Sequence, residues 1–512
     1  MRDLTPILVG AGQCMQRDFS DPARLLSPLG LMSLAAQRAC IDAGLKPTAL
    51  ESIDALACVR LFEHSVGDRG MWPNPFGSTD NVPWAIARRL GLAPREAIYA
   101  EVGGQSPQRL VNRFAERVHA GDVRMALLTG AEAIATIRHG MRQKLAFDWR
   151  EVAHGEFEDR WPGAPFVTPY EQRHGIAWPI HVYAMFEQVR RHARGMTLDA
   201  CRAEIGRLFA PFSAVAAAHP YAQFPTALAH AFLATVSASN YALADPYTRW
   251  MVAQDGVNQG AAVLVTSVAT ARELGIPESR WVYLRGYADV DDVNVLKRPN
   301  LAASRAQNLA VTHALDTSGV GIDAVRHLDF YSCFPIAVSS IAEPLGLPLD
   351  GTRPLTLTGG LPFFGGPGNN YSMHAIATLV ERLRADRDSL GLIVANGGYL
   401  SKHSAAVYAG RPAPVWAPVS SAAQQAEAKA DTGIVVDEQG SGPATIETYA
   451  AIHAKGALTD GFVVARLASG ARCLARVPPG DAAALGCLGQ AAVIGRPILV
   501  GRDGELHTFR AA

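Results

Sequence analysis

A glycine-rich loop before a helix is the stretch of this sequence best suited to holding a ligand. The loop runs from Gly359 to Asn370 and reads GGLPFFGGPGNN, and apolar residues at helical spacing follow from Tyr371 to Ala385. Glycine lets a backbone turn sharply and approach a bound molecule closely. The start of a helix adds unpaired N–H groups and a positive dipole end, which favour a negatively charged oxygen. A tight turn without a ligand would have the same composition, so both interpretations stay open.

Two more glycine pairs lie where predicted strands and helices meet. Gly103-Gly104 precedes a helix predicted from about Gln105 to Ala120, and Asn396-Gly397-Gly398 follows a strand predicted from Leu392 to Ala395. At the first of these helix starts, Gln105 and Ser106 are candidate contacts for a ligand oxygen. Capping the helix is the alternative role, both for them and for the asparagines that end the long glycine loop.

Five side chains near these loops are candidates for chemistry. Tyr331 and Cys333 follow a predicted buried strand, and Tyr331 could donate its phenol to a carbonyl oxygen. A hydrogen bond from Tyr331 to backbone, and a packing role for Cys333, are the alternatives. His374 lies about one turn into the helix, where a structural histidine is the alternative to a catalytic one. Tyr399 follows the last glycine pair and could face the same cavity, as could His403.

Bulk composition excludes several classes of protein. The chain has 512 residues, 49% of them hydrophobic, and Lys plus Arg balance Asp plus Glu at 47 each. A neutral chain has no net field to attract nucleic acid, and no run approaches the roughly 20 apolar residues of a membrane span. The first residues lack the pattern of a signal peptide, and the seven cysteines are scattered without a C-x-x-C pair. These features predict a cytoplasmic protein with reduced thiols, and they contain no metal-ligand spacing, P-loop or dinucleotide fingerprint.

Strands and helices alternate along most of the chain, which predicts an α/β protein with a parallel, helix-covered sheet. The order of strand, glycine turn and helix occurs twice, which indicates an internal duplication. Residues 134–240 interrupt the first half with a segment rich in Trp, His, Arg and Pro. Residues 420–431 look like a linker or an exposed helix, and short alternating runs from about residue 440 predict a small β domain that forms a barrel. The predicted domains are therefore residues 1–275, 276–418 and 419–512.

Four segments, in this order, resemble motifs of the thiolase superfamily, the fold of acetyl-CoA acetyltransferases and sterol-carrier-protein thiolases. The segments are Val118–Glu132, Tyr331–Phe334, Gly359–Pro367 and Asn396–Gly398. The added β domain and the phrase Gly-Gly-Gln-Ser-Pro-Gln at 103–108 look like thiolase-like protein type 1, a bacterial group with an extra C-terminal domain. The resemblance covers about residues 4–415 and implies two βαβαβαββ halves with helix-covered sheets. It adds a small OB-like β-barrel at the C-terminus.

All four catalytic positions of a thiolase differ in this chain. Gly104 stands where the family has its nucleophilic cysteine, and Gly366 stands where it has the histidine of Gly-His-Pro. The second cysteine corresponds to Ala395 or Asn396, and Tyr331 replaces the Asn or His that positions water. Without a thiolate to carry the acyl group, the resemblance implies a protein that is not a normal thiolase. We expect the missing side chain at position 104 to enlarge the space between the loops.

The resemblance implies coenzyme A or an acyl-CoA as the ligand, with no covalently bound cofactor, and a role in lipid metabolism. The favoured function is acyl-CoA binding with altered acyltransferase chemistry or none. The alternatives are a retro-aldolase acting on a β-hydroxyacyl-CoA and a scaffold without catalysis. Thiolases are typically dimers through the N-terminal half, which the added domain could block to leave a monomer. The candidate catalytic residues are Tyr331, Cys333 and His374, and the candidate CoA contacts are Gly104, Gln105, Ser106, Gly365, Gly366, Asn369, Asn370 and Tyr399.

Overall fold

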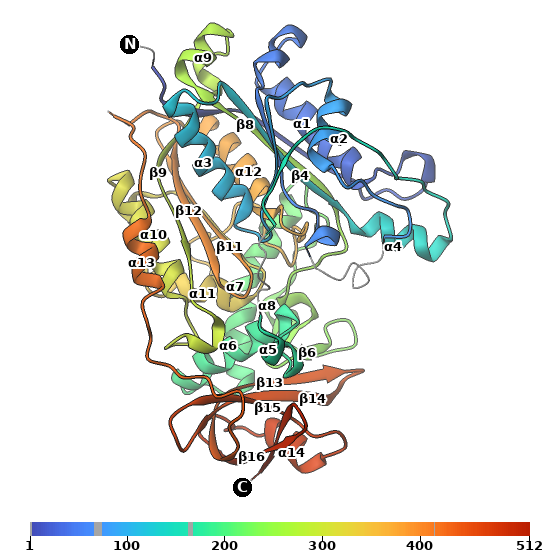
Figure 1. The fold of residues 1–512 in the computed structure, drawn as a ribbon, viewed down its shortest axis with the longest axis vertical. Helices are drawn as coiled ribbons and strands as arrows, with labels where there is room; N and C mark the ends of the chain where they lie inside the picture. Colours follow the sequence, from blue (N-terminus) through green and yellow to red (C-terminus); the bar gives the residue numbers. More distant parts are fainter. Residues whose placement is uncertain (1–2, 66–73, 162–166, 414, 512) are drawn as a thin grey trace.

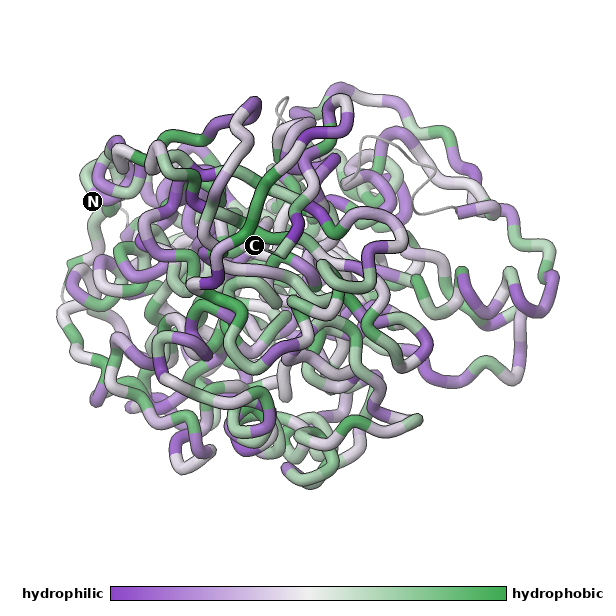
Figure 2. The backbone as a smooth tube through the Cα atoms, turned by 90° about the horizontal axis from the view of Figure 1, so that it is seen from below, coloured by the Kyte–Doolittle hydropathy of each residue, from purple (hydrophilic) through white to green (hydrophobic). Residues whose placement is uncertain are grey.

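The structure is a computed structural model that describes residues 3–65, 74–161, 167–413 and 415–511. Two half-sheets with helices between and around them form the upper part in Figure 1, and a β domain lies below them. Seen from the β-domain end, the most hydrophilic segments gather along the outer turns (Figure 2). Among the described residues, no helix combines the length and the apolar character that a membrane crossing needs.

Ten strands of the described chain form one hydrogen-bonded sheet in the order β10-β11-β12-β9-β1-β8-β4-β2-β3-β5. Their bounds are β1 Pro6–Met15, β2 Ala55–Cys58, β3 Glu96–Tyr99, β4 Met125–Ala133, β5 Glu158–Asp159, β8 Asn258–Ser267, β9 Val282–Asp291, β10 His327–Phe330, β11 Leu390–Gly397 and β12 Lys402–Ala409. The sheet is mixed, because β8 lies antiparallel to both β1 and β4 while β2 lies parallel to β3 and β4. The expectation of a parallel sheet was therefore wrong, because β8 and β12 run antiparallel to the strands on both sides of them.

The two halves of this sheet meet only where the start of β1 pairs with the start of β9, at Ile7–Tyr283 and Leu8–Val282. Helices α3 (Ser106–Ala120) and α12 (Tyr371–Ala385) fill the space between the halves. Their apolar residues share one core cluster with strand residues of both halves. The resemblance to a duplicated thiolase fold is thus confirmed in its layers, with both faces of each half-sheet buried.

Outer helices cover the remaining faces. In the N-terminal half these are α1 (Pro28–Asp42) and α2 (Val82–Leu90), and in the C-terminal half α10 (Arg305–Ser318) and α11 (Pro335–Ala342). Strand residues alternate between the central and outer clusters: Leu8 joins the central one, while its neighbours Ile7 and Val9 join the outer one. Because successive side chains face opposite sides of a sheet that is covered on both sides, a continuous apolar run correctly predicts a buried strand.

The segment between β4 and β8 forms most of a helical layer next to the C-terminal half. It contains α4 Ile134–Gln143, α5 Pro169–Arg173, α6 Pro179–Ala193, α7 Leu198–Ala218, α8 His230–Ala234, β6 Ala242–Ala244 and β7 Tyr247–Thr248. A short helix, α9 (Val268–Glu273), follows β8. The apolar side chains of α6 and α7 share a core cluster with those of α10, α11 and the C-terminal domain. This layer is therefore a packed part of the molecule rather than a loose insertion.

The C-terminal β region is a closed five-stranded barrel, as the sequence predicted. Its strands are β13 Gly442–Ala454, β14 Ala457–Leu467, β15 Arg472–Arg476, β16 Pro497–Asp503 and β17 Leu506–Ala511, with α14 Ala482–Leu488 between β15 and β16. Neighbours follow the order β14-β15-β17-β16-β13, and pairing of β14 with β13 closes the ring. The barrel sheet continues into the helical layer, because Ile452 of β13 pairs with Ala244 of β6.

The connection to the barrel contains a helix, α13 (Ala422–Ala428), which was one of the two expectations for this segment. Its residues are held against β9: Ser421 Oγ accepts from Asp289 N at 3.1 Å, and Gln425 exchanges hydrogen bonds with the N–H and C=O of Asp291. The segment is thus anchored on one side. The domain boundaries at residues 275 and 418 stay predictions.

Candidate functional site

The glycine loops expected to form the site do meet, at the N-terminal ends of α3 and α12. Gly103 N donates to Asn369 Oδ1 at 3.0 Å, and Ser372 Oγ of α12 donates to Gly104 O at 2.7 Å. A Cβ atom built on Gly397 would lie 1.8 Å from Gln105 Oε1, so the third loop is in direct contact with the first. Segments from both halves of the chain therefore converge on one small region.

The phenol of Tyr331 occupies the space beside Gly104. A Cβ atom built on Gly104 would lie 2.3 Å from Tyr331 Oη and 2.4 Å from Tyr331 Cζ. The expectation that a missing side chain at position 104 leaves a larger space was therefore wrong, because a larger side chain from the other half fills it. The tyrosine and the glycine are a matched pair, since any side chain at 104 would displace the phenol.

The Tyr331 hydroxyl is neutral and has no fixed partner. The residue is 8% exposed, and within the described residues no group hydrogen-bonds to Oη. Burial, with a smaller contribution from nearby Cys333, raises the pKa of Tyr331 well above that of a free phenol. At neutral pH this hydroxyl therefore acts as a hydrogen-bond donor and not as a phenolate base.

Further buried polar atoms around Tyr331 also lack partners in the described structure. They are Gln105 Oε1, Ser106 Oγ, Asn370 Oδ1 and Asn396 Oδ1. Buried polar atoms in proteins are nearly always hydrogen-bonded, so these atoms would gain from a partner such as water. Gln105 Oε1 packs against Gly103 and Gly397, and Asn370 Oδ1 packs against Gly130. The capping alternative is not what the structure has: Gln105 and Asn370 stand at the N-caps of α3 and α12 without a side-chain capping bond.

The two asparagines of the long loop hold the halves of the chain together. Asn369 Nδ2 donates to Arg60 O and to Ser65 Oγ, both at 2.8 Å, while its Oδ1 accepts from Gly103. Asn370 Nδ2 donates to Gly130 O at 2.6 Å, at the end of β4. These bonds fix the N-terminus of α12 against the N-terminal half.

The glycines of the same loop differ in the space they leave. At Gly365, with φ of +118°, a Cβ atom would lie 2.6 Å from Gln259 Oε1, so the position requires glycine. A Cβ atom on Gly366, the counterpart of the family's histidine, would have its nearest neighbours at 3.4 Å, which is ordinary contact. The backbone at position 366 therefore does not require glycine.

Cys333 and Asn396 meet at the hydroxyl of Tyr183, a residue of α6 that the sequence analysis missed. Tyr183 Oη accepts from Asn396 Nδ2 at 2.8 Å and from Leu400 N at 2.9 Å, and it donates to Gly398 O at 3.1 Å. Asn396 Nδ2 lies 3.7 Å from Cys333 Sγ. Burial raises the pKa of the Cys333 thiol to about 12, so it stays protonated and is a poor nucleophile at neutral pH. No local sequence pattern marks Tyr183, since it stands among other apolar residues of a helix.

Tyr399 and His374 form hydrogen bonds with residues outside the group around Tyr331. Tyr399 Oη donates to Ala177 O at 2.8 Å, which ties its turn to the segment before α6. His374 is fully buried, and its Nδ1 lies 2.8 Å from Gln13 Oε1, so this nitrogen carries the proton. Burial and the neighbouring His219 lower the pKa of His374 to about 3. A neutral ring tied to β1 fits the structural alternative, and its catalytic role remains a prediction.

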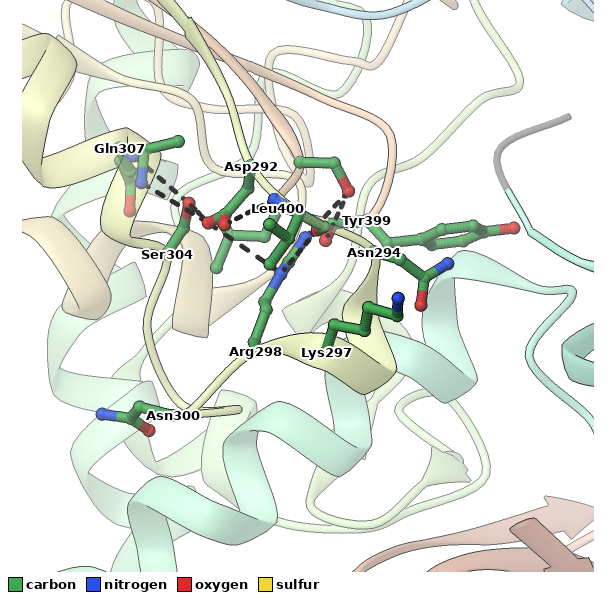
Figure 3. A network of polar contacts seen from close by, with 12 residues as sticks. Asp292, Asn294, Lys297, Arg298, Asn300, Ser304, Gln307, Tyr399 and Leu400 are labelled. Carbon is green, nitrogen blue, oxygen red and sulfur yellow. Dashed lines mark hydrogen bonds and ion pairs between the residues drawn. The ribbon is translucent and has the colours of Figure 1, made fainter. Parts of the chain in front are cut away.

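A second polar cluster, around Asp292, Ser304 and His403, combines the residue types of a hydrolytic triad in a different arrangement. Figure 3 shows Asp292 and Ser304 side by side. Ser304 Oγ donates directly to Asp292 Oδ2 at 2.5 Å and lies 3.0 Å from His403 Nε2. The hydroxyl has only one proton, so His403 Nε2 donates to it and cannot act as its base. Ser304 is fully buried, and the cluster supports the end of β9 and the start of β12. In the described residues, no three His, Cys, Asp or Glu side chains are grouped so as to hold a metal ion.

The layers, the converging glycine loops and the paired helix N-termini define a protein of the thiolase fold. Solved structures agree: human mitochondrial 3-ketoacyl-CoA thiolase in complex with CoA has a TM-score of 0.55 and 14% identity, over 80% of this chain and 100% of the other. The Ltp2-ChsH2(DUF35) aldolase has a TM-score of 0.57 and 16% identity, over 80% and 98%. At these identities the likeness shows the fold alone.

A more similar structure places the chain in a particular family. The monomeric SCP2-thiolase-like protein type 1 from Mycobacterium smegmatis is 36% identical, with a TM-score of 0.85 over 100% of both chains. The family model described as thiolase-like protein type 1 additional C-terminal domain matches residues 424–505. None of the curated proteins matches the sequence. The chain belongs to the SCP2-thiolase-like protein type 1 family.

The contact between Gly104 and Tyr331 predicts a specific stability defect. Gly104→Cys should lower the free energy of unfolding by about 1–3 kcal/mol, because the new side chain overlaps the phenol. The matched control is Gly366→Ala, where the added Cβ has room and should have little effect. In the double variant Gly104→Cys/Tyr331→Ala, the cost should be smaller than the sum of the two single costs. Urea unfolding of the wild type, the two single variants, the double variant and the Gly366→Ala control measures this, and strictly additive costs would contradict the overlap.

The buried histidines predict a pH dependence of stability. His374 and His219, with pKa values lowered to about 3 and about 4 from 6.5, stay neutral in the folded protein while the unfolded chain protonates them. Their contribution is therefore complete above pH 6.5 and is lost as the pH falls through the folded-state values. His374→Gln should reduce the slope of unfolding free energy against pH by about 1 kcal/mol per unit between about pH 6 and 5. The exposed His154→Gln is the control, and equal slopes in wild type and His374→Gln would disprove the prediction.

Proposed function

We propose that this protein binds the thioester end of an acyl-CoA between the N-termini of α3 and α12, without thiolase chemistry. The observation that carries the proposal is the hydroxyl of Tyr331 beside Gly104, at the place of a thiolase nucleophile; it is neutral and has no partner among the described residues. A hydroxyl donor next to a helix N-terminus suits a thioester oxygen, or the enolate oxygen formed from it. The unpaired atoms of Ser106 and Asn396 offer further polar contacts.

Thiolysis is a poor fit to the same residues. It requires a thiolate that becomes acylated, and Gly104 supplies no side chain while the Cys333 thiol stays protonated. Gly366 and Asn396 likewise carry no imidazole or thiol. The protein from Mycobacterium smegmatis shares the full length of this chain, and the human thiolase was solved with CoA. These relatives support an acyl-CoA ligand. The chemistry has to be inferred from the residues of this chain.

Retro-aldol cleavage of a β-hydroxyacyl-CoA is the second candidate. The reaction breaks the bond between the α and β carbons, gives a carbonyl product and an acyl-CoA enolate, and moves the hydroxyl proton to a base. Tyr331 fits the donor that stabilises the enolate, and its raised pKa makes it unsuited to be the base. The unpaired Asn396 Oδ1 favours this candidate, because it could accept a hydrogen bond from the β-hydroxyl. A scaffold without catalysis is the third interpretation.

We also propose that the protein acts in the cytoplasm as a monomer. The edge of β3, which ends the N-terminal half-sheet, is covered by β5 through Ile98–Glu158 and Tyr99–Asp159. The covering strand comes from the segment after α4 and not from the added barrel. The relative from Mycobacterium smegmatis is described as monomeric, which supports this state.

A comparison of the affinities for an acyl-CoA and for free CoA separates the contribution of the Tyr331 hydroxyl from that of the rest of the CoA molecule. Isothermal calorimetry should detect binding of both ligands. Tyr331→Phe should lower the affinity for acetyl-CoA by about five- to tenfold, which corresponds to the loss of one hydrogen bond. Free CoA has no thioester oxygen, so its affinity should stay within about twofold. Tyr241→Phe, which removes an exposed hydroxyl far along the chain, is the control. Equal losses for both ligands would contradict the placement of the thioester at Tyr331.

Activity assays separate the three interpretations. Acetoacetyl-CoA with free CoA should give no thiolysis, and turnover on the order of 10 per second would overturn the proposal. Release of acetyl-CoA from a 3-hydroxyacyl-CoA, abolished by Tyr331→Phe, would support the retro-aldolase. Absence of binding at millimolar ligand would leave the scaffold interpretation.

A further inference from the structure

We infer that the C-terminal barrel is part of the scaffold of the site, because it holds the turn from Gly397 to Ser401 through two separate routes. The main link is Arg472, which acts through Arg298 as a positioning residue. The placement of this turn beside a ligand site rests on the proposed function. The inference that the barrel holds the turn in place does not depend on that function.

The turn itself needs support. Leu400 has a φ of +54°, a left-handed conformation that is unfavourable for a branched side chain. Its N–H donates to Tyr183 Oη, and Ser401 N donates to Gly397 O at 3.1 Å. Asn396, whose side chain lies beside Cys333, directly precedes this turn. A change in the turn would therefore move Asn396 and the residues around it.

The first route begins at Arg472 of β15, which is fully buried between the barrel and the C-terminal half. Its Nη1 donates to Leu296 O and to Arg298 O, both at 2.7 Å, while Nε donates to Glu447 Oε2 at 2.7 Å. Glu447 pins the guanidinium in the barrel, so the two remaining bonds fix the backbone of the short helix Val295–Lys297 and the residue after it. Barrel and C-terminal half are joined here by charge-assisted bonds shielded from water.

Arg298 then carries the link to the turn. Its side chain is 2% exposed, and Nη2 donates to Ser401 Oγ at 2.9 Å while Asp292 Oδ2 lies 3.9 Å from Nε. Asp292 N also donates to Ser401 O at 2.7 Å. Figure 3 shows Arg298 lying between Asp292 and the turn that bears Leu400 and Tyr399. Arg298 Nε also donates to Val293 O at 3.4 Å, and the guanidinium carbon lies 5.6 Å from the centre of the Phe186 ring of α6. Nη1 has no hydrogen-bond partner among the described residues.

The second route runs through α6. Thr448 Oγ1 of β13 donates to Met185 O at 2.6 Å, and Arg191 Nη2 donates to Tyr449 Oη at 3.2 Å. This helix carries Tyr183, the hydroxyl that bonds to Asn396, Gly398 and Leu400. Strand pairing of Ile452 with Ala244 adds backbone continuity between the barrel and this layer. Arg298 and Tyr183, which are two of the supports of the turn, are thus both attached to the barrel.

Amide hydrogen exchange of the full-length protein tests the first route. Arg472→Lys keeps the charge next to Glu447 but loses the two-carbonyl contact, so peptides covering residues 397–403 should exchange about tenfold faster or more. Arg466→Lys is the matched control, because Arg466 also pairs with Glu447 and has no bond to residues 296–298. It should leave those peptides unchanged. A loss of protection confined to the barrel in Arg472→Lys would overturn the inference.

Ser401→Ala provides a second variant that leaves the barrel untouched. It removes the contact with Arg298, so it should also speed exchange at 397–403, and adding Arg472→Lys should then have little further effect. Independent, additive effects of the two changes would contradict a route through Arg298. The same variants can be titrated with acetyl-CoA. Faster exchange with unchanged affinity would keep the scaffold inference and count against the proposed ligand site.

Discussion

The contact of Tyr331 with Gly104 is the constraint on which the site depends. A side chain at position 104 and a phenol at position 331 exclude each other, because the added Cβ would come within 2.3 Å of the hydroxyl. The exchange removes a nucleophile and puts a neutral hydrogen-bond donor at the same helix N-terminus. Under the proposed function, the chain has a donor for an acyl oxygen but no nucleophile that could form an acyl-enzyme.

The surroundings of this contact depend on connections that reach far along the chain. Asn369 links the α12 N-terminus to Arg60, Ser65 and Gly103, and Tyr183 links α6 to the turn after β11. The barrel holds both that helix and the segment around Arg298. The barrel shares a core cluster and a β-sheet with the helical layer, so it is a structural part of the protein. The closed five-stranded form of the barrel would not by itself indicate this.

Most of the fold could be predicted from the sequence, because the apolar periodicity and the glycine stops are local signals. The helix Tyr371–Ala385 has the predicted bounds, the helix Ser106–Ala120 begins one residue after the predicted start, and the barrel closes as expected. Strand directions were not predicted, since the long segment before β8 gives no sign of the direction in which β8 runs, and the Asn396-Gly397-Gly398 turn before β12 was interpreted only as a glycine loop. The meeting of the glycine loops followed from the resemblance. The filling of the space at Gly104 by Tyr331, and the role of Tyr183, depend on contacts between distant segments that no pattern in the sequence encodes.

A crystal structure with bound acetyl-CoA tests the central claim most directly. We predict that the thioester oxygen lies within about 3 Å of Tyr331 Oη, at the N-terminus of α3, with the phenol as its donor. Free CoA in a parallel structure should leave that position to water. An acyl group bound elsewhere, with Tyr331 still packed on Gly104 and without a polar partner, would contradict the account.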